Sequence, residues 1–136
     1  MTDSGPPFSW ALPSDVTAPR RARHLVESAC GDLCSPQVDT ARLLVTELVA
    51  NAVQHGAAPV VLHVARDDGA LRVEVQDAGP DLPSMLEGAQ GGRACGLWVV
   101  AALASEWGVT EHDNGVPGKR VWFVLDCSDE AQAEPH

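Results

Sequence analysis

The 136-residue chain lacks long apolar segments and is poor in basic residues. No hydrophobic run reaches the roughly 18 residues that a membrane-spanning helix needs. The N-terminal stretch MTDSGPPFSW has no basic-then-apolar signal pattern, so we expect a cytoplasmic protein without membrane contact. Only 9 Lys and Arg accompany 19 Asp and Glu, giving a net charge of -10. That balance disfavours direct nucleic-acid binding, which needs clustered positive charge, and fits a basic protein partner better.

Aromatic residues and cysteines are also few: the chain has no tyrosine, 4% aromatics and four cysteines. Cys30 and Cys34 would lie about one turn apart on a helix, with His24 nearby, so a metal site is one interpretation. Buried free thiols are the other interpretation, because no further ligand is evident and a cytoplasm keeps cysteines reduced.

The hydrophobic content of 45% is typical of a globular domain, and the chain length suits one hydrophobic core. We expect a single domain over residues 8–126, with flexible tails at 1–7 and 127–136.

The sequence pattern predicts an α+β fold. A short edge strand at 8–12 precedes a helix that Thr17 caps, with Pro19 in its first turn. A second helix begins at Ser35 and Pro36 and stops at Gly56. Two hairpins are predicted, one from strands 59–66 and 70–77 and one from strands 107–113 and 118–126, with a third helix over 96–106 between them. The apolar stripe of the second helix consists of Ala41, Leu44, Val45, Leu48 and Ala52.

Three polar residues on the second helix, Glu47, Asn51 and His55, recur at four-residue steps. At about 100° per residue they span roughly 80° and flank the apolar stripe, so they face the seam between helix and sheet. An unpaired polar group buried there costs about 1–3 kcal/mol, which an open seam holding a polar ligand would avoid. Carboxylate and amide oxygens suit Mg²⁺ bound with phosphates, and a carboxylate there can orient or deprotonate a hydroxyl. The alternative is that Glu47 and His55 are solvated residues at the helix edge and that Asn51 forms a local hydrogen bond.

A second candidate feature follows the predicted strand 70–77. Asp77 at its end can accept a hydrogen bond from the exocyclic amine of a purine, with Gly79 letting the base approach closely; a turn-forming aspartate is the alternative. The glycine- and proline-rich stretch 78–95 is long for a compact domain, as functional loops are. Gly91, Gly92 and Gly96 then open the third helix, where backbone N–H groups suit an anion.

The order of these motifs resembles the Bergerat-fold ATPases, the superfamily of gyrase, histidine-kinase and MutL domains. Within it the chain is similar to the bacterial anti-sigma-factor serine kinases of the RsbW and SpoIIAB type, especially the short ATP-binding regulators of actinomycetes. The matching segments are LLVTELVANAVQHG, VEVQDAGP, GGRACGLWVVAALASEWGV and GKRVWFVLD. The resemblance implies a two-layer α/β sandwich, with a mostly antiparallel sheet covered on one face by about three helices.

The resemblance also implies ATP and Mg²⁺ as cofactors. Glu47 is implied as the catalytic base or hydroxyl-orienting carboxylate and as a Mg²⁺ neighbour through water. Asn51 is implied as the Mg²⁺ ligand, and His55 as a neighbour of the phosphates. Asp77 is implied to take the adenine amine, with Gly79 beneath the base. The other positions implied to contact the nucleotide are Gly92, Gly96, Leu97 and Gly118.

Such a domain is implied to phosphorylate a serine on an anti-anti-sigma (STAS) partner, to sequester a sigma factor when that partner is unavailable, and to form a homodimer. The chain departs from the family pattern at Ala94, where a glycine is usual, at Pro80-Asp81, where a further glycine is common, and at Lys119 and Arg120, where a threonine is frequent. These departures keep an alternative open: an adaptor that regulates by docking, with weak nucleotide binding or none. Arg93, Lys119 and Arg120 supply positive charge to the triphosphate or belong to the solvated surface.

Overall fold

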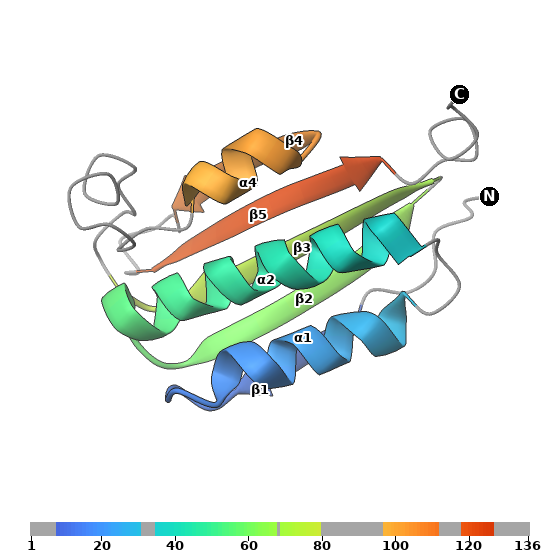
Figure 1. The fold of residues 1–136 in the computed structure, drawn as a ribbon. Coiled ribbons are helices and arrows are strands. Elements are labelled where there is room, and N and C mark those ends of the chain that lie inside the picture. The colour runs from blue at the N-terminus through green and yellow to red at the C-terminus, as the bar shows by residue number, and fades with distance from the viewer. Residues whose placement is uncertain (1–7, 31–34, 68, 80–96, 112–117, 127–136) are drawn as a thin grey trace, which may run out of the picture.

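The computed structural model describes residues 8–30, 35–67, 69–79, 97–111 and 118–126. Figure 1 shows helices and strands in the order expected of an α+β domain. The elements are β1 (Phe8–Leu12), α1 (Ala18–Ala29), α2 (Ser35–His55), β2 (Val60–Asp67), β3 (Ala70–Asp77), α4 (Leu97–Leu103), β4 (Glu106–Glu111) and β5 (Lys119–Asp126).

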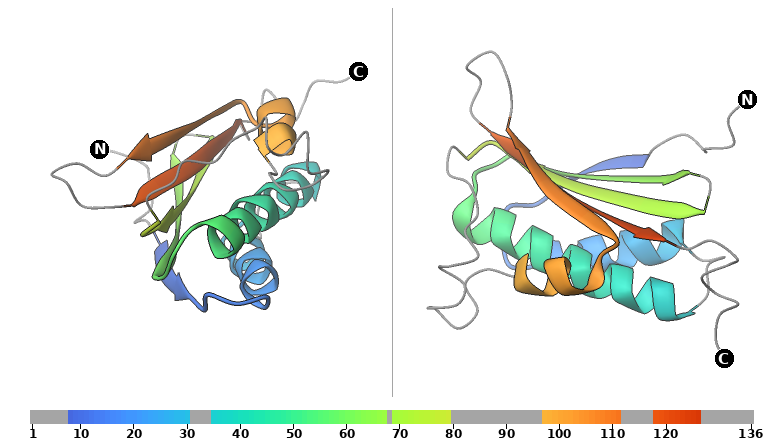
Figure 2. Two further views of the ribbon diagram at one scale, coloured as in Figure 1. Left: turned by 90° about the vertical axis from the view of Figure 1, so that its left-hand side faces the viewer. Right: turned by 90° about the horizontal axis from the view of Figure 1, so that it is seen from above.

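The five strands form one sheet in the order β1-β2-β3-β5-β4, and each neighbouring pair is antiparallel. The three labelled helices lie on one face of this sheet, with α2 between α1 and α4 (Figures 1 and 2). The structure therefore has the predicted two-layer architecture, with β1 as the predicted edge strand.

The core lies between the two layers. Strand β3 alternates: Leu71, Val73 and Val75 are buried, while the intervening side chains are partly exposed. The period of two places these three apolar side chains on the helix-covered face of the sheet. All five residues of the predicted apolar stripe on α2 are buried in the same core. A full burial of a Val or Leu side chain stabilises the fold by about 1.5–3 kcal/mol.

Helix α1 starts at the predicted cap, but its capping differs from the prediction. The Thr17 side chain makes no hydrogen bond to the helix. Instead, Asp15 Oδ1 accepts hydrogen bonds from the Thr17 hydroxyl and from the Thr17 backbone N–H. These bonds hold the pKa of the Asp15 carboxyl below its ordinary 3.8.

The predicted third helix extends too far along the chain. Helix α4 ends at Leu103, and strand β4 already begins at Glu106. The backbone N–H of Ser105 donates to Val124 O at 2.8 Å, and Ser105 Oγ accepts from the Asp126 N–H at 3.0 Å. Pairing with the neighbouring strand thus replaces another helical turn, a long-range effect that local periodicity does not reveal.

Several predicted features lie outside the described residues. They include both tails, Cys34, the glycine-rich stretch from Pro80 to Gly96 and the turn around Asn114. Within the part of the chain that the structure describes, no helix is long and apolar enough to cross a membrane. The described ranges also contain no group of three or more His, Cys, Asp or Glu side chains placed to hold a metal ion, and Cys30 is buried in the core.

Candidate functional site

Three chain segments meet at one end of the molecule: the end of α2, the end of β3 and the start of β5 (Figure 1). Asp77, the last residue of β3, lies among them and is only 2% exposed. We call Asp77, Lys119, Gly56 and Gly79 the Asp77 site. A carboxylate is rarely buried to this extent unless it is paired, so its partners define what the site can do.

Lys119, the first residue of β5, lies directly opposite Asp77 in the β3–β5 register. Its Nζ donates to Asp77 Oδ1 at 2.9 Å, and Lys119 itself is 4% exposed. The backbone N–H of Gly79 donates to the same oxygen at 2.7 Å. Lys119 is therefore a buried partner of the carboxylate, which corrects the alternative that it belongs to the solvated surface.

Arg120 points to the opposite face of the sheet. Its side chain is exposed, and its Nη1 lies 3.6 Å from Glu74 Oε1. Arg120 therefore belongs to the solvated surface, while its neighbour Lys119 is buried.

Two glycines allow the end of β3 to approach the end of α2. A Cβ added to Gly56 would lie 2.4 Å from Asp77 Cγ and 2.7 Å from Ala52 O. A Cβ on Gly79 would lie 2.8 Å from Gly56 Cα. The Ala78 N–H also donates to Ala57 O at 2.9 Å. Gly56, predicted only as a helix stop, thus has a second role that only the tertiary contact reveals.

The three predicted polar residues on α2, here called the polar row, run along the helix away from the Asp77 site. Glu47 and Asn51 are partly buried, and His55 is exposed at the last position of α2. His55 precedes Gly56 and so lies at the same end as Asp77, while Glu47 lies about 12 Å away along the helix axis. The fold therefore connects two features that are separated in sequence by the whole β2–β3 hairpin.

The remaining predicted positions are placed only in part. Gly92 and Gly96 lie outside the described residues, and Leu97 is the first residue of α4. Gly118 has a φ of 133°, a backbone conformation that favours glycine, and it directs the chain into β5 beside Asp77.

The donor atoms of the polar row fit a magnesium ion in their chemistry. Asn51 offers an amide oxygen and Glu47 a carboxylate, one helical turn apart on α2. Mg²⁺ is typically held by one or two protein oxygens together with phosphates and water. The row thus matches a metal that arrives with a phosphate ligand.

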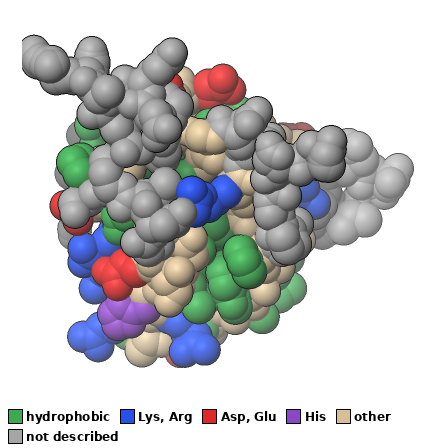
Figure 3. All heavy atoms as spheres, turned by 90° about the vertical axis from the view of Figure 1, so that its right-hand side faces the viewer, with side chains coloured by type: hydrophobic (Ala, Val, Ile, Leu, Met, Phe, Trp, Pro, Cys, Tyr) green, Lys and Arg blue, Asp and Glu red, His purple; other side chains and the backbone are tan. Residues whose placement is uncertain are grey.

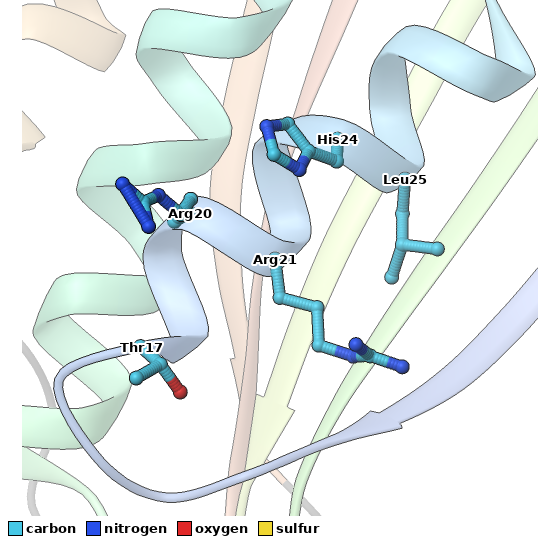
Figure 4. A pocket seen from close by; sticks show the side chains of 5 residues that line it. All are labelled: Thr17, Arg20, Arg21, His24 and Leu25. Atoms are coloured by element: carbon cyan, nitrogen blue, oxygen red, sulfur yellow. The ribbon is translucent and has the colours of Figure 1, made fainter.

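A separate cavity of about 300 Å³ lies on helix α1. Figure 4 shows its lining side chains, which come from the N-cap and the first part of this helix as far as its middle: Thr17, Arg20, Arg21, His24 and Leu25. Arg20 and Arg21 form no ion pair with another described residue. Two guanidinium groups can bind an anionic group, but the cavity contains no member of the polar row or of the Asp77 site.

The opposite end of the molecule has a different character. Figure 3 shows acidic and basic side chains interspersed there, with hydrophobic side chains between them. Among the described residues drawn there, positive and negative side chains are mixed, so we place no ligand on this face.

Comparison with known proteins decides the family. Residues 12–125 match the family model described as the histidine kinase-like ATPase domain. The chain belongs to this family. The superfamily resemblance drawn from the motifs is thereby confirmed over nearly all of the described fold.

Among solved structures, this histidine kinase-like ATPase domain is similar to the crystal structure of the RsbU and RsbW domains of Rv1364c from Mycobacterium tuberculosis. The TM-score is 0.64 with 22% sequence identity. The match covers 89% of this chain and 32% of the other chain, so this domain spans about a third of that protein. At such identity the comparison establishes the fold. The search of curated proteins gives no match.

Proposed function

We propose that this histidine kinase-like ATPase domain binds MgATP and transfers the γ-phosphoryl group to a serine of an anti-anti-sigma (STAS) protein. We further propose that it sequesters a sigma factor when that partner is unavailable. One observation carries the proposal: the buried Asp77, at the end of β3, lies beside the end of helix α2, and this helix holds Glu47 and Asn51. This placement supports a base-binding carboxylate beside one end of the helix that carries the proposed phosphate-binding row.

The order of groups along α2 suggests how a nucleotide lies. Asp77 accepts a hydrogen bond from the adenine amine, and Gly79 lies beneath the base. The phosphates extend along the polar row towards Glu47. His55 adjoins Gly56, so its position favours contact near the base or ribose over the phosphate contact predicted from the sequence. Gly92, Gly96 and Leu97 would supply backbone N–H groups at the start of α4.

Glu47 and Asn51 would perform the chemistry. Asn51, with Glu47 through water, would hold Mg²⁺, which offsets the negative charge of the phosphates when bound. The Glu47 carboxylate orients the serine hydroxyl and accepts its proton. The serine oxygen forms a bond to the γ-phosphorus, the bond from that phosphorus to the β,γ-bridging oxygen breaks, and ADP leaves with the electron pair.

A specific observation favours a second candidate, the adaptor that docks without catalysis. Lys119 already pairs with the carboxylate that would receive the adenine amine. If this pair excludes the base, the domain regulates through protein contacts alone. The net charge of -10 suits a basic sigma-factor surface in both cases.

Phosphate transfer from labelled ATP separates the two candidates. We expect the purified chain to label a STAS protein encoded by the same genome. Glu47→Gln should abolish transfer while MgATP binding survives, and Asn51→Ala should remove the magnesium dependence of binding. Gln54→Ala is the matched control, because Gln54 is exposed on the same helix. MgATP binding without transfer to any candidate partner would refute the kinase, and no binding at millimolar MgATP would favour the adaptor.

A further inference from the structure

A buried basic residue, Lys119, lies beside the proposed base-binding carboxylate. The proposed kinase mechanism assigns it no role. Lys119 Nζ lies 2.9 Å from Asp77 Oδ1, and both residues are almost inaccessible to solvent. Removing an ammonium group from water is costly, and a buried ion pair contributes little net stability compared with apolar residues of similar size. The stability of the fold therefore gives no sufficient reason for a lysine at this position.

Within the part of the chain that the structure describes, the pair also uses only part of its hydrogen-bonding capacity. A lysine ammonium has three N–H donors, and a carboxylate can accept about four hydrogen bonds. Among the described residues, Asp77 is the one acceptor of Lys119 Nζ, and Asp77 Oδ1 receives donors from Lys119 and Gly79. The site thus presents an acceptor and a donor side by side.

This arrangement is complementary to one edge of adenine. The 6-amino group of adenine donates, and the adjacent ring nitrogen N1 accepts, so a protein can read the two positions together. We propose that Lys119 is a specificity-determining residue: Asp77 accepts from the 6-amino group while Lys119 donates to N1. This role rests on the proposed function. The ion pair then forms part of the adenine-binding site. The adaptor candidate requires the opposite, namely that the pair excludes the base.

Nucleotide analogues test the role in the chain without substitutions. Titration calorimetry with MgCl₂ would compare ATP with 1-deaza-ATP, in which N1 is replaced by C–H, and with purine riboside triphosphate, which lacks the 6-amino group. We expect each analogue to bind about tenfold more weakly or worse, because each removes one hydrogen bond between the base and a buried charged group. GTP, which presents an acceptor at the 6-position and a donor at N1, should also bind more weakly than ATP.

Variants assign the effect to Lys119. Lys119→Met should weaken ATP binding and make the affinities for ATP and 1-deaza-ATP equal. Lys119→Gln keeps an N–H donor on a side chain that can still reach Asp77, so part of the preference for ATP should remain. Arg120→Met is the matched control: its side chain is on the opposite face of the sheet, and it should keep the natural ratio.

The outcomes separate this role from the proposed function. Equal binding of ATP and 1-deaza-ATP to the natural chain would overturn the role of Lys119 and leave nucleotide binding intact. Failure of all the nucleotides to bind would overturn both. Circular dichroism and thermal unfolding establish that each variant is folded; should Lys119→Met unfold, the analogue comparison in the natural chain and the Lys119→Gln variant still decide.

Discussion

At the scale of single residues, the Asp77–Lys119 ion pair determines how any substitution at the base site must be interpreted. Asp77→Asn removes one charge and leaves a buried ammonium without its counterion. We expect this to lower the free energy of unfolding by about 3–5 kcal/mol. Urea denaturation of the purified variant measures the loss.

Two comparisons complete that experiment. Asp77→Asn combined with Lys119→Met should recover most of the lost stability, because neither charge then remains buried. Asp39→Asn, which breaks an exposed ion pair with Arg42, should change the stability by less than about 1 kcal/mol. A small effect of Asp77→Asn alone would show that Lys119 is not buried as a charged group. Loss of ATP binding in that single variant therefore does not by itself identify the adenine contact.

Gly56 is the second residue with a decisive contact. Gly56→Ala adds a methyl group within 2.4 Å of Asp77 Cγ and 2.7 Å of the backbone oxygen of Ala52. Since a backbone atom cannot easily move away, we expect a destabilisation of about 1–3 kcal/mol and weaker nucleotide binding. Gly69→Asn is the control: Gly69 has a φ of 83° in the β2–β3 turn, which asparagine tolerates. Equal stability of Gly56→Ala and the natural chain would contradict the close approach of α2 and β3.

At the scale of elements, helix α2 packs on the sheet between α1 and α4 and carries the polar row. Adjacent leucines on this helix allow a direct test of its orientation. Leu44 is fully buried, whereas Leu43 is 43% exposed. Leu44→Ala should cost about 2–5 kcal/mol through lost burial and a residual cavity, and Leu43→Ala much less. Chemical denaturation of both variants checks this, and similar losses would mean that the helix is rotated from the described position.

At the scale of the whole molecule, nucleotide binding should appear as added stability. A ligand that binds only the folded state at 100 times its Kd adds about 2.7 kcal/mol. For a domain of this size, saturating MgATP should raise the unfolding midpoint on the order of 10 °C. Scanning fluorimetry with MgATP, with ATP plus EDTA, and with MgCl₂ alone measures the shift and its metal dependence. An unchanged midpoint at millimolar MgATP would favour the adaptor.

Local patterns in the sequence predicted most of the architecture. The period of two in residues 70–77 and the apolar stripe beginning at Ala41 each depend on neighbours a few residues away, so the strand, the helix and their buried faces were readable. The start of α1 after Thr17 and the helix stop before Gly56 were equally local signals. The end of α4 was predicted wrongly because a hydrogen bond from Ser105 to the distant Val124 determines it.

The sequence by itself determined which polar groups this domain has and the spacing of Glu47, Asn51 and His55 on one helix, since helical geometry fixes that spacing. Only the tertiary structure decided where Asp77 lies relative to that helix and that Lys119 is its buried partner. Both depend on the register of β3 with β5 and on the close approach at Gly56, which are contacts between segments far apart in the chain. The charge of a lysine can be read from its letter, but its burial beside one particular carboxylate depends on the whole fold.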